Sequence, residues 1–444
     1  MKPLVLGLLL LPLSAVAADV ETLLSNGPAD RRIDLVIMGD GYLDTEQTKL
    51  HDDAVTLTTY LFSLTPYKEY QALFNVRLVH VISNQTGADN GTYGALRDTA
   101  LGAYFNCAQI DRLLCVDTAA VYAQANLSAP SWDVIVVLVN DPKYGGSGGT
   151  VSVISSNTSA KEIFSHELGH TLGGLADEYT TAYPGYAPCV TECPEPNASL
   201  NATRATVKWA PWIDLATPVP SPVGTPGIGV FDGCRYRTHD VYRPTDQSCM
   251  MNLLGQPYCS VCTEGLILSL WERSSPIEDA RPPPMNEVDV TPCASQTFSF
   301  ATPQVASLGG FVWTLDGQTQ PSTSTTFTLP TASLTNGPHQ VTVTVHDTTA
   351  LVRNDPSRML EATQIWAVVA DSCGGSTGGG GGSGGGGSTG GGSTGGGGSD
   401  SDDGGSTGGG SSDSGSTGEG GGASGVGDGD GAAGGGLQSP VSLR

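Results

Sequence analysis

The sequence predicts an α/β domain with a mostly parallel sheet, followed by an all-β, immunoglobulin-like sandwich and a disordered tail. Over residues 18–281, short apolar segments alternate with helical patterns, which favours parallel strands covered by helices. Over residues 282–373, apolar and polar residues alternate with period two, as in half-buried strands. From residue 374 to residue 444 the chain is mainly Gly, Ser and Thr, a composition that cannot bury a core.

The first region contains near-continuous apolar segments that are typical of strands buried on both faces. Helical patterns lie between these segments, and a glycine-rich loop at residues 144–149 precedes the last strand. The expected strands are 33–40, 76–82, 132–139 and 150–155, and the expected helices are 45–62 and 111–124.

The second region is about the right length for an immunoglobulin-like sandwich, with period-two segments at residues 311–315 and 340–345. Trp313 is its expected core aromatic, and Cys293 and Cys373 are placed to clasp its two ends. The tail is expected to be a flexible coil. It serves either as a spacer that holds the protein away from a surface or as a solvated tail without a partner.

The start of the chain predicts export. Lys2 precedes an apolar run at residues 4–13, and residues 15–17 have the small-x-small form of a cleavage site, so residues 1–17 are expected to be a signal peptide. Later segments are too short or too polar to cross a bilayer, so no transmembrane span is expected in the mature chain. The mature protein is therefore expected to be secreted or displayed at the cell surface.

Cysteine count and charge agree with that setting. The chain has ten cysteines, an even number that suits an oxidising compartment. Cys107 can pair locally with Cys115, and Cys189 with Cys193, whereas the C-x-x-C segment at residues 259–262 is either a redox or metal pair or a structural one. The formal net charge of −24 argues against nucleic acid or an anionic membrane as a partner. The sequence favours no particular oligomeric state.

The pentad at residues 166–170 carries the chemistry. His166 and His170 are four residues apart, so on a helix both imidazoles lie on one face and reach one zinc ion. Glu167 between them is placed to act as general base toward an attacking water. Gly173 and Gly174 end the helix after the second histidine, and residues 177–179 follow at once with carboxylates that offer a third ligand.

Four separated segments together resemble the IgA-peptidase-like zinc metallopeptidases, in the order that this family has. The resemblance spans residues 33–272 and is carried by residues 37–42, 144–149, 164–179 and 242–262. It implies a metzincin-like fold and a secreted zinc endopeptidase that acts on a protein or peptide substrate. It does not imply that the substrate is immunoglobulin A.

The metzincin pattern has a glycine and then a third histidine after the pentad. Gly173 is at the glycine position, but Ala176 stands where the third histidine would be and cannot bind metal. A carboxylate is an acceptable zinc ligand, so we expect Asp177 to be the third ligand, with Glu178 as the alternative. Tyr179 then serves in packing or as a transition-state donor.

Downstream, Met250 is the expected methionine of the turn beneath the metal, with Met251 as the alternative. The tyrosine that usually follows two residues later is replaced by Asn252. An oxyanion donor is therefore expected from elsewhere, and the candidates are Tyr242, His239 and Arg243.

The sequence thus predicts a secreted zinc endopeptidase with one zinc ion per chain. The expected metal ligands are His166, His170 and Asp177, and Glu167 is the expected general base. Two other functions remain open: a zinc hydrolase of another amide bond, such as a cell-wall amidase, and a non-catalytic surface binding protein.

Overall fold

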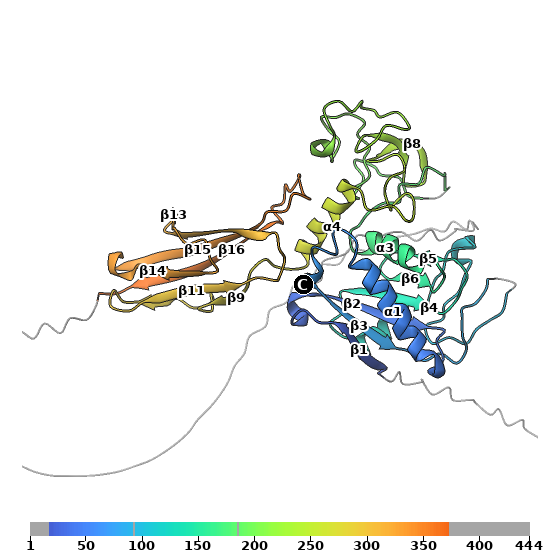
Figure 1. The fold of residues 1–444 in the computed structure, drawn as a ribbon, viewed down its shortest axis with the longest axis horizontal. Coiled ribbons are helices and arrows are strands. Elements are labelled where there is room, and N and C mark those ends of the chain that lie inside the picture. Colours follow the sequence, from blue (N-terminus) through green and yellow to red (C-terminus); the bar gives the residue numbers. More distant parts are fainter. Residues whose placement is uncertain (1–16, 92–93, 184–185, 373–444) are drawn as a thin grey trace, which may run out of the picture. The chain divides into compact units, whose positions relative to one another are not determined.

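A six-stranded sheet forms the first part of the structure, with strand order β1-β3-β2-β4-β6-β5 (Figure 1). The four inner strands are parallel to one another, and the two outer strands are antiparallel to their neighbours. The strands are β1 Asp19–Leu24, β2 Ile33–Asp40, β3 Phe74–His80, β4 Val134–Val139, β5 Gly146–Ser147 and β6 Ser152–Ser155.

This computed structural model describes residues 17–91, 94–183 and 186–372. These residues belong to one compact unit. The expected signal peptide, apart from its last residue, and the expected tail at residues 374–444 lie outside the described residues. Within the described ranges, no helix is both long and apolar enough to cross a membrane.

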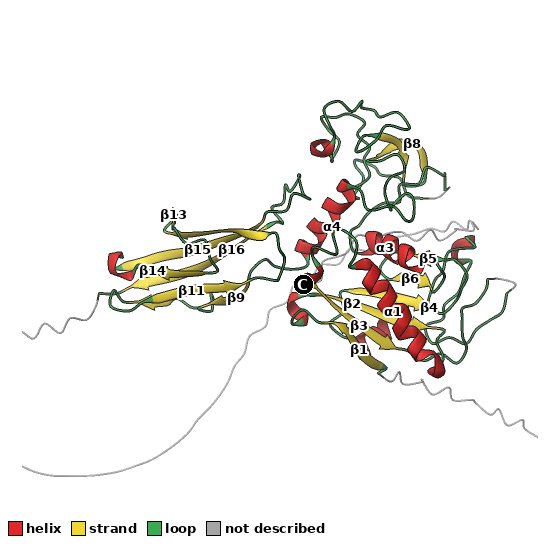
Figure 2. Cartoon of the chain, in the orientation of Figure 1, coloured by secondary structure: helices red, strands yellow, loops and turns green. Residues whose placement is uncertain are grey.

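Within the described residues, the sheets are accompanied by the α-helices α1 Gln47–Leu61, α2 Thr118–Ser128, α3 Ala160–Thr171 and α4 Ser260–Glu272. Helices are drawn in red in Figure 2, where α1, α3 and α4 are labelled. Alternate residues of β2 face two different apolar cores, because side chains alternate along a strand. Leu35 and Ile37 lie in the core shared with α1, α3 and α4, and Val36 and Met38 lie in the core shared with α2. The predicted α/β class of this region is therefore confirmed.

The helix expected at residues 111–124 begins later than predicted, at Thr118. A disulfide between Cys107 and Cys115 closes the preceding segment into a loop, as the spacing of these cysteines predicted. Asp117 then caps the helix, since its carboxylate accepts hydrogen bonds from the backbone N–H groups of residues 119 and 120. The cap and the disulfide together determine where α2 begins.

The C-terminal part of the described chain is rich in strands. A five-stranded sheet, β10-β16-β15-β12-β13, and a three-stranded sheet, β14-β11-β9, enclose one apolar core. Trp313 is fully buried there and stacks on Trp366 with ring centroids 5.7 Å apart, as expected of a core aromatic. The strands are β9 Glu278–Arg281, β10 Val288–Val290, β11 Gln296–Ala301, β12 Leu308–Leu315, β13 Gln318–Thr319, β14 Thr326–Leu329, β15 Gly337–Asp347 and β16 Glu361–Ala370.

Smaller elements complete the described chain. A two-stranded sheet, β7 Phe231–Cys234 and β8 Arg237–Arg243, lies between α3 and α4 in sequence. A second disulfide joins Cys189 and Cys193, as predicted. Cys293 is also disulfide-bonded, and its expected partner Cys373 lies outside the described residues. Short 3₁₀ helices are Ala29–Arg31, Asp44–Glu46, Gln71–Leu73, Cys107–Gln109, Ala210–Trp212 and Thr331–Ser333.

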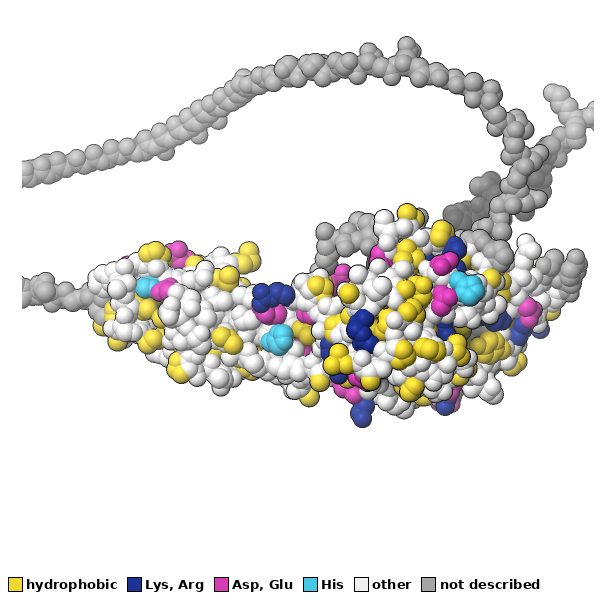
Figure 3. Space-filling view, turned by 90° about the horizontal axis from the view of Figure 1, so that it is seen from above, with side chains coloured by type: hydrophobic (Ala, Val, Ile, Leu, Met, Phe, Trp, Pro, Cys, Tyr) yellow, Lys and Arg dark blue, Asp and Glu magenta, His cyan; other side chains and the backbone are white. Residues whose placement is uncertain are grey.

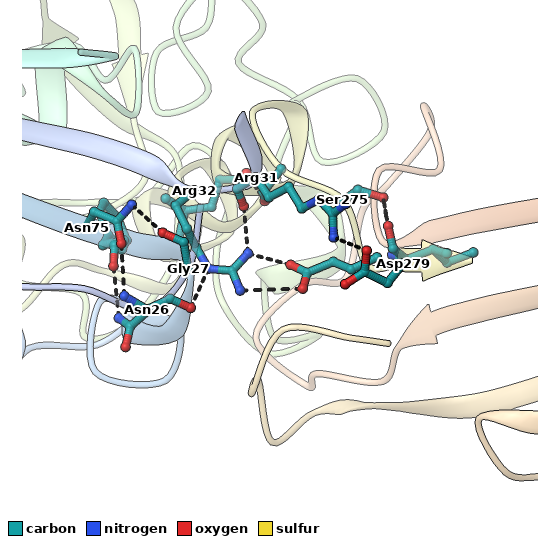
Figure 4. A network of polar contacts seen from close by, with 12 residues as sticks. Asn26, Gly27, Arg31, Arg32, Asn75, Ser275 and Asp279 are labelled. Atoms are coloured by element: carbon teal, nitrogen blue, oxygen red, sulfur yellow. Dashed lines mark hydrogen bonds and ion pairs between the residues drawn. The ribbon is translucent and has the colours of Figure 1, made fainter. Parts of the chain in front are cut away.

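Polar contacts join the segment just before β2 to β9 (Figure 4). Arg32 forms an ion pair with Glu278, and Arg31 pairs with Asp279 at 2.9 Å. β9 itself pairs with β11 of the three-stranded sheet, although it precedes the expected domain limit at residue 281. The domain limits at residues 281 and 373 therefore stay predictions.

Asp347, at the end of β15, is a fully buried carboxylate that links three elements. Its Oδ2 accepts hydrogen bonds from Tyr70 Oη at 2.7 Å and from Trp271 Nε1 on α4 at 2.8 Å. We expect Asp347→Ala to lower the free energy of unfolding by about 3 kcal/mol, because two buried donors lose their acceptor. Urea unfolding measures this difference. The exposed Asp289→Ala of β10 is the control, and an equal effect of the two substitutions would contradict the role of Asp347.

Candidate metal centre

Helix α3 presents the two histidines of the pentad on one face. His166 is buried and His170 nearly so, and their Nε2 atoms are 3.2 Å apart. The helix then ends, and Gly174 adopts a φ of +57°, which a side chain disfavours. This turn brings the Leu175 carbonyl back to accept a hydrogen bond from His170 Nδ1 at 2.7 Å. The glycine stop expected from the sequence thus redirects the chain across the end of α3.

The redirected chain brings Asp177 to the two imidazoles. Asp177 Oδ1 lies 3.0 Å from His166 Nε2 and 3.4 Å from His170 Nε2. Glu178 points away from them and is held by Asn197 and by Thr245, each at 3.1 Å. Of the two carboxylates considered as third ligand, it is therefore Asp177 that lies beside the histidines, because successive side chains of an extended segment point to opposite sides.

Neighbouring residues that are not candidate ligands orient His166 and Asp177. His166 Nδ1 lies 3.0 Å from the Met250 carbonyl oxygen, so in the tautomer that donates this bond its Nε2 lone pair faces Asp177. Tyr236 Oη donates to Asp177 Oδ2 at 2.6 Å. The ring of Tyr179 stacks on His166 with centroids 6.1 Å apart, which is the packing role considered for it. Such outer contacts are typical around metal-binding histidines and carboxylates.

The electrostatics of Asp177 and His170 favour a bound cation. Although burial opposes it, the neighbouring histidines hold the pKa of the Asp177 carboxyl well below its usual range. Burial also disfavours the charged form of His170, but the Asp177 carboxylate outweighs it and raises the pKa of His170 to about 9. The cluster thus favours a positive charge beside Asp177. Two imidazole nitrogens and one carboxylate oxygen within 4.8 Å of one another are a donor set that fits zinc.

Glu167 lies on the same helix beside the glycine-rich loop. A Cβ at Gly148 would lie 2.7 Å from Glu167 Oε2 and 3.1 Å from His170 Cβ and Cδ2, so only glycine allows the loop to approach this closely. Burial raises the pKa of the Glu167 carboxyl, and the charges of the two histidines and of Arg112 act against this rise. A carboxylate and the three candidate ligands thus share one small region at the end of the loop.

The candidate oxyanion donors lie elsewhere. Arg243 donates to the backbone carbonyls of Asp232 and Gly233, both at 2.6 Å, and His239 is exposed and paired with Asp232 at 2.7 Å. Tyr242 pairs through its backbone with Ser199. Among the described contacts, these three side chains do not reach the histidine pair, so their selection is not supported by the geometry.

Sequence reasoning did not find Tyr236 or Arg112. Tyr236 lies just after β7, 59 residues from Asp177 in the chain, and no motif marks it. Arg112 lies in the loop closed by the Cys107–Cys115 disulfide, and its charge acts on Glu167. Both reach the site only through tertiary contacts, so a local pattern could not reveal them.

The model of the IgA peptidase M64 family matches residues 21–226, a range that includes the pentad, Asp177 and Glu178. No curated protein matches the chain.

Two solved structures show weak likeness. SGBP-B from the mixed-linkage glucan utilization locus of Bacteroides ovatus, in complex with a heptasaccharide, is 15% identical, with 19% of this chain and 20% of that chain covered and a TM-score of 0.15. A nucleoside hydrolase-related hypothetical protein from Saccharophagus degradans, associated with carbohydrate metabolism, is 11% identical, with 77% and 100% covered and a TM-score of 0.18. At these scores neither structure bears on fold or function. The family match, by contrast, confirms the resemblance seen in the sequence: residues 21–226 match the model of the IgA peptidase M64 family.

Proposed function

We propose that the protein is an exported zinc-dependent endopeptidase with a metzincin-like fold. His166, His170 and Asp177 bind one zinc ion, and Glu167 is the general base. The observation that carries this proposal is the convergence of two imidazole nitrogens and one carboxylate oxygen within 3.0–3.4 Å at the end of α3. The peptidase family of this segment supports a peptide bond as the target.

Different residues of the site have different roles in hydrolysis. When bound, zinc supplies Lewis-acid chemistry that favours attack of water on the scissile carbonyl. Glu167 takes the proton of the attacking water and returns it to the leaving amine. Asp177 and the two histidines hold their positions through Tyr236, Met250 and Leu175, so the donor atoms converge before substrate arrives. No covalent bond to the enzyme is required.

Each region of the chain has a role in this function. Residues 1–17 serve as signal peptide, residues 18–281 as peptidase domain, residues 282–373 as an immunoglobulin-like accessory domain and residues 374–444 as a spacer. On the face shown in Figure 3, acidic and basic side chains are interspersed among uncharged and apolar ones. Together with the net charge of −24, this mixed surface suits a protein or peptide substrate better than a polyanion.

Removal of metal tests the proposal directly. We expect 1,10-phenanthroline to abolish cleavage of an unstructured peptide library by the mature chain, and added zinc to restore it, because the water-activating charge is lost and regained. The same enzyme is assayed in parallel on muropeptides. Cleavage of muropeptides alone would assign a cell-wall amidase instead, and peptide cleavage that the chelator leaves unchanged would remove the metal from the mechanism.

Tyr236 is expected to matter through Asp177. Tyr236→Phe deletes the 2.6 Å hydrogen bond to Asp177 Oδ2 and keeps the ring. We expect zinc affinity to fall about 10- to 100-fold, the usual effect of losing a partner of a metal ligand. Competition with a zinc chelator measures the change. Tyr183→Phe is the matched control, since this neighbouring ring contacts Tyr236. Equal affinities in the two variants would show that the hydrogen bond does not support the ligand.

A further inference from the structure

A second group of side chains of metal-ligating types lies next to the first site, since it includes Glu178, the neighbour of Asp177. Glu178, Cys249, Cys259 and Cys262 each direct one ligand atom to a common region, and these four atoms all lie within 4.8 Å of one another. All four residues are buried. They come from three separate segments: the strand-like segment after Asp177, the loop before Met250 and the start of α4.

The spacing of the ligand atoms suits tetrahedral zinc. With Zn–S distances of about 2.3 Å and Zn–O distances of about 2.0 Å, two sulfur ligands lie about 3.8 Å apart, and a sulfur and an oxygen about 3.5 Å apart. Cys249 Sγ and Cys262 Sγ are 3.5 Å apart, and Cys262 Sγ is 3.6 Å from Glu178 Oε1. These two pairs of ligand atoms therefore already have nearly the separations that a zinc ion between them would require.

The burial of Glu178 also points to a cation. The residue is completely buried, and within the described parts of the chain its carboxylate forms no ion pair with Lys, Arg or His. Its oxygens are oriented by Asn197 and Thr245, which are themselves buried. Buried carboxylates are normally paired or bound to metal, because an isolated charge in an apolar region is strongly unfavourable. The amide and the hydroxyl orient the carboxylate but carry no charge to balance it.

The cysteines favour metal over a disulfide. The group has three thiols, so a disulfide between any two of them would leave the third thiol unpaired and the buried carboxylate without a balancing charge. Cys259 and Cys262 form a C-x-x-C pair at the beginning of α4, with Cys259 as the N-cap residue. The partial positive charge of a helix N-terminus favours thiolates, and this spacing is common in structural zinc sites.

We propose that Glu178, Cys249, Cys259 and Cys262 bind a second, structural zinc ion. Asp177 and Glu178 are adjacent and face opposite ways, and Cys249 directly precedes Met250, whose carbonyl orients His166. The second zinc therefore ties together the two segments that position Asp177 and His166. It resolves the choice left open for residues 259–262 in favour of a metal pair, and it adds one zinc to the single ion expected from the sequence. The site stands independently of the proposed peptidase activity.

The experiment measures zinc content and zinc–sulfur bonding in the full mature chain, purified without chelators. We expect two zinc ions per chain by elemental analysis. X-ray absorption at the zinc edge should show a population with three sulfur neighbours at about 2.3 Å. The double variant His166→Ala/His170→Ala removes the first site and should retain one zinc ion with an all-sulfur-and-oxygen shell. This variant separates the second site from the fate of the proposed function.

Two cysteine variants sharpen the test. Cys262→Ser should lose the sulfur-rich zinc, whereas Cys234→Ser should keep it, because Cys234 is a buried free cysteine outside the group. If Cys262→Ser does not fold, the absorption spectrum of the wild-type chain still shows whether zinc has sulfur neighbours. Three results would each overturn the proposal: zinc without sulfur neighbours in the wild-type chain, a disulfide between any two of Cys249, Cys259 and Cys262, or loss of the sulfur-rich zinc in Cys234→Ser.

Discussion

Glu167→Gln is expected to lower turnover by a factor of about 10² to 10⁴ while zinc stays bound, which is the usual contribution of general acid–base catalysis. The substitution keeps the size of the side chain, so the glycine-rich loop that approaches it at Gly148 is undisturbed. What is lost is the basic carboxylate that accepts the proton of the attacking water. Steady-state kinetics on a peptide substrate and zinc analysis of the same preparation measure the two properties side by side.

Glu162→Gln is the matched control for this prediction. Glu162 lies in the first turn of the same helix, beside Lys161, and is outside the group of candidate ligands. We expect it to retain the turnover of the wild-type chain. Near-normal turnover of Glu167→Gln would show that another group is the base. Loss of zinc from Glu167→Gln would show instead that Glu167 supports the metal.

Asp177→Ala is expected to abolish peptide cleavage and to remove the zinc held by the histidines. Its Oδ1 lies 3.0 Å and 3.4 Å from the two Nε2 atoms, so its loss leaves only two ligands. We expect affinity at this site to fall by more than about 100-fold, since even the loss of an outer partner has an effect of 10- to 100-fold. The sulfur-bound zinc should remain, because Glu178 faces away from the histidines.

Two carboxylate variants give this prediction its controls. Asp232→Ala removes a partly exposed carboxylate paired with His239 and should leave metal and activity unchanged. Glu178→Ala should weaken binding of the sulfur-bound zinc more than binding of the zinc at the histidines. If Glu178→Ala instead releases the histidine-bound zinc while Asp177→Ala retains it, the assignment of the third ligand is wrong.

Short-range patterns predicted the four parallel strands to within two residues at each end, whereas β1 was not predicted. The buried strand β2 spans Ile33–Asp40, the same residues as its apolar run, because a strand covered on both faces needs apolar side chains at nearly every position. The start of α2 was missed, since Asp117 and the nearby disulfide set it rather than the helical periodicity. Element type thus follows from local composition, whereas its limits follow from caps and cross-links.

The sequence alone determined that His166 and His170 share one face of a helix, because a spacing of four residues corresponds to about one helical turn. It also narrowed the third ligand to Asp177 or Glu178. Only the tertiary structure separated these two carboxylates, since the turn at Gly174 sends one toward the histidines and the other toward Cys249 and Cys262.

Tertiary structure also explains why no sequence pattern revealed the hydrogen-bond partners of Asp177 and His166. Tyr236 reaches Asp177 from the β7–β8 turn, and the Met250 carbonyl reaches His166 across 84 residues of chain. Such contacts depend on how distant segments pack, and packing is set by the apolar core as a whole rather than by any local motif. The sequence therefore determined which residue types carry the chemistry, and the folded structure decided which of them meet.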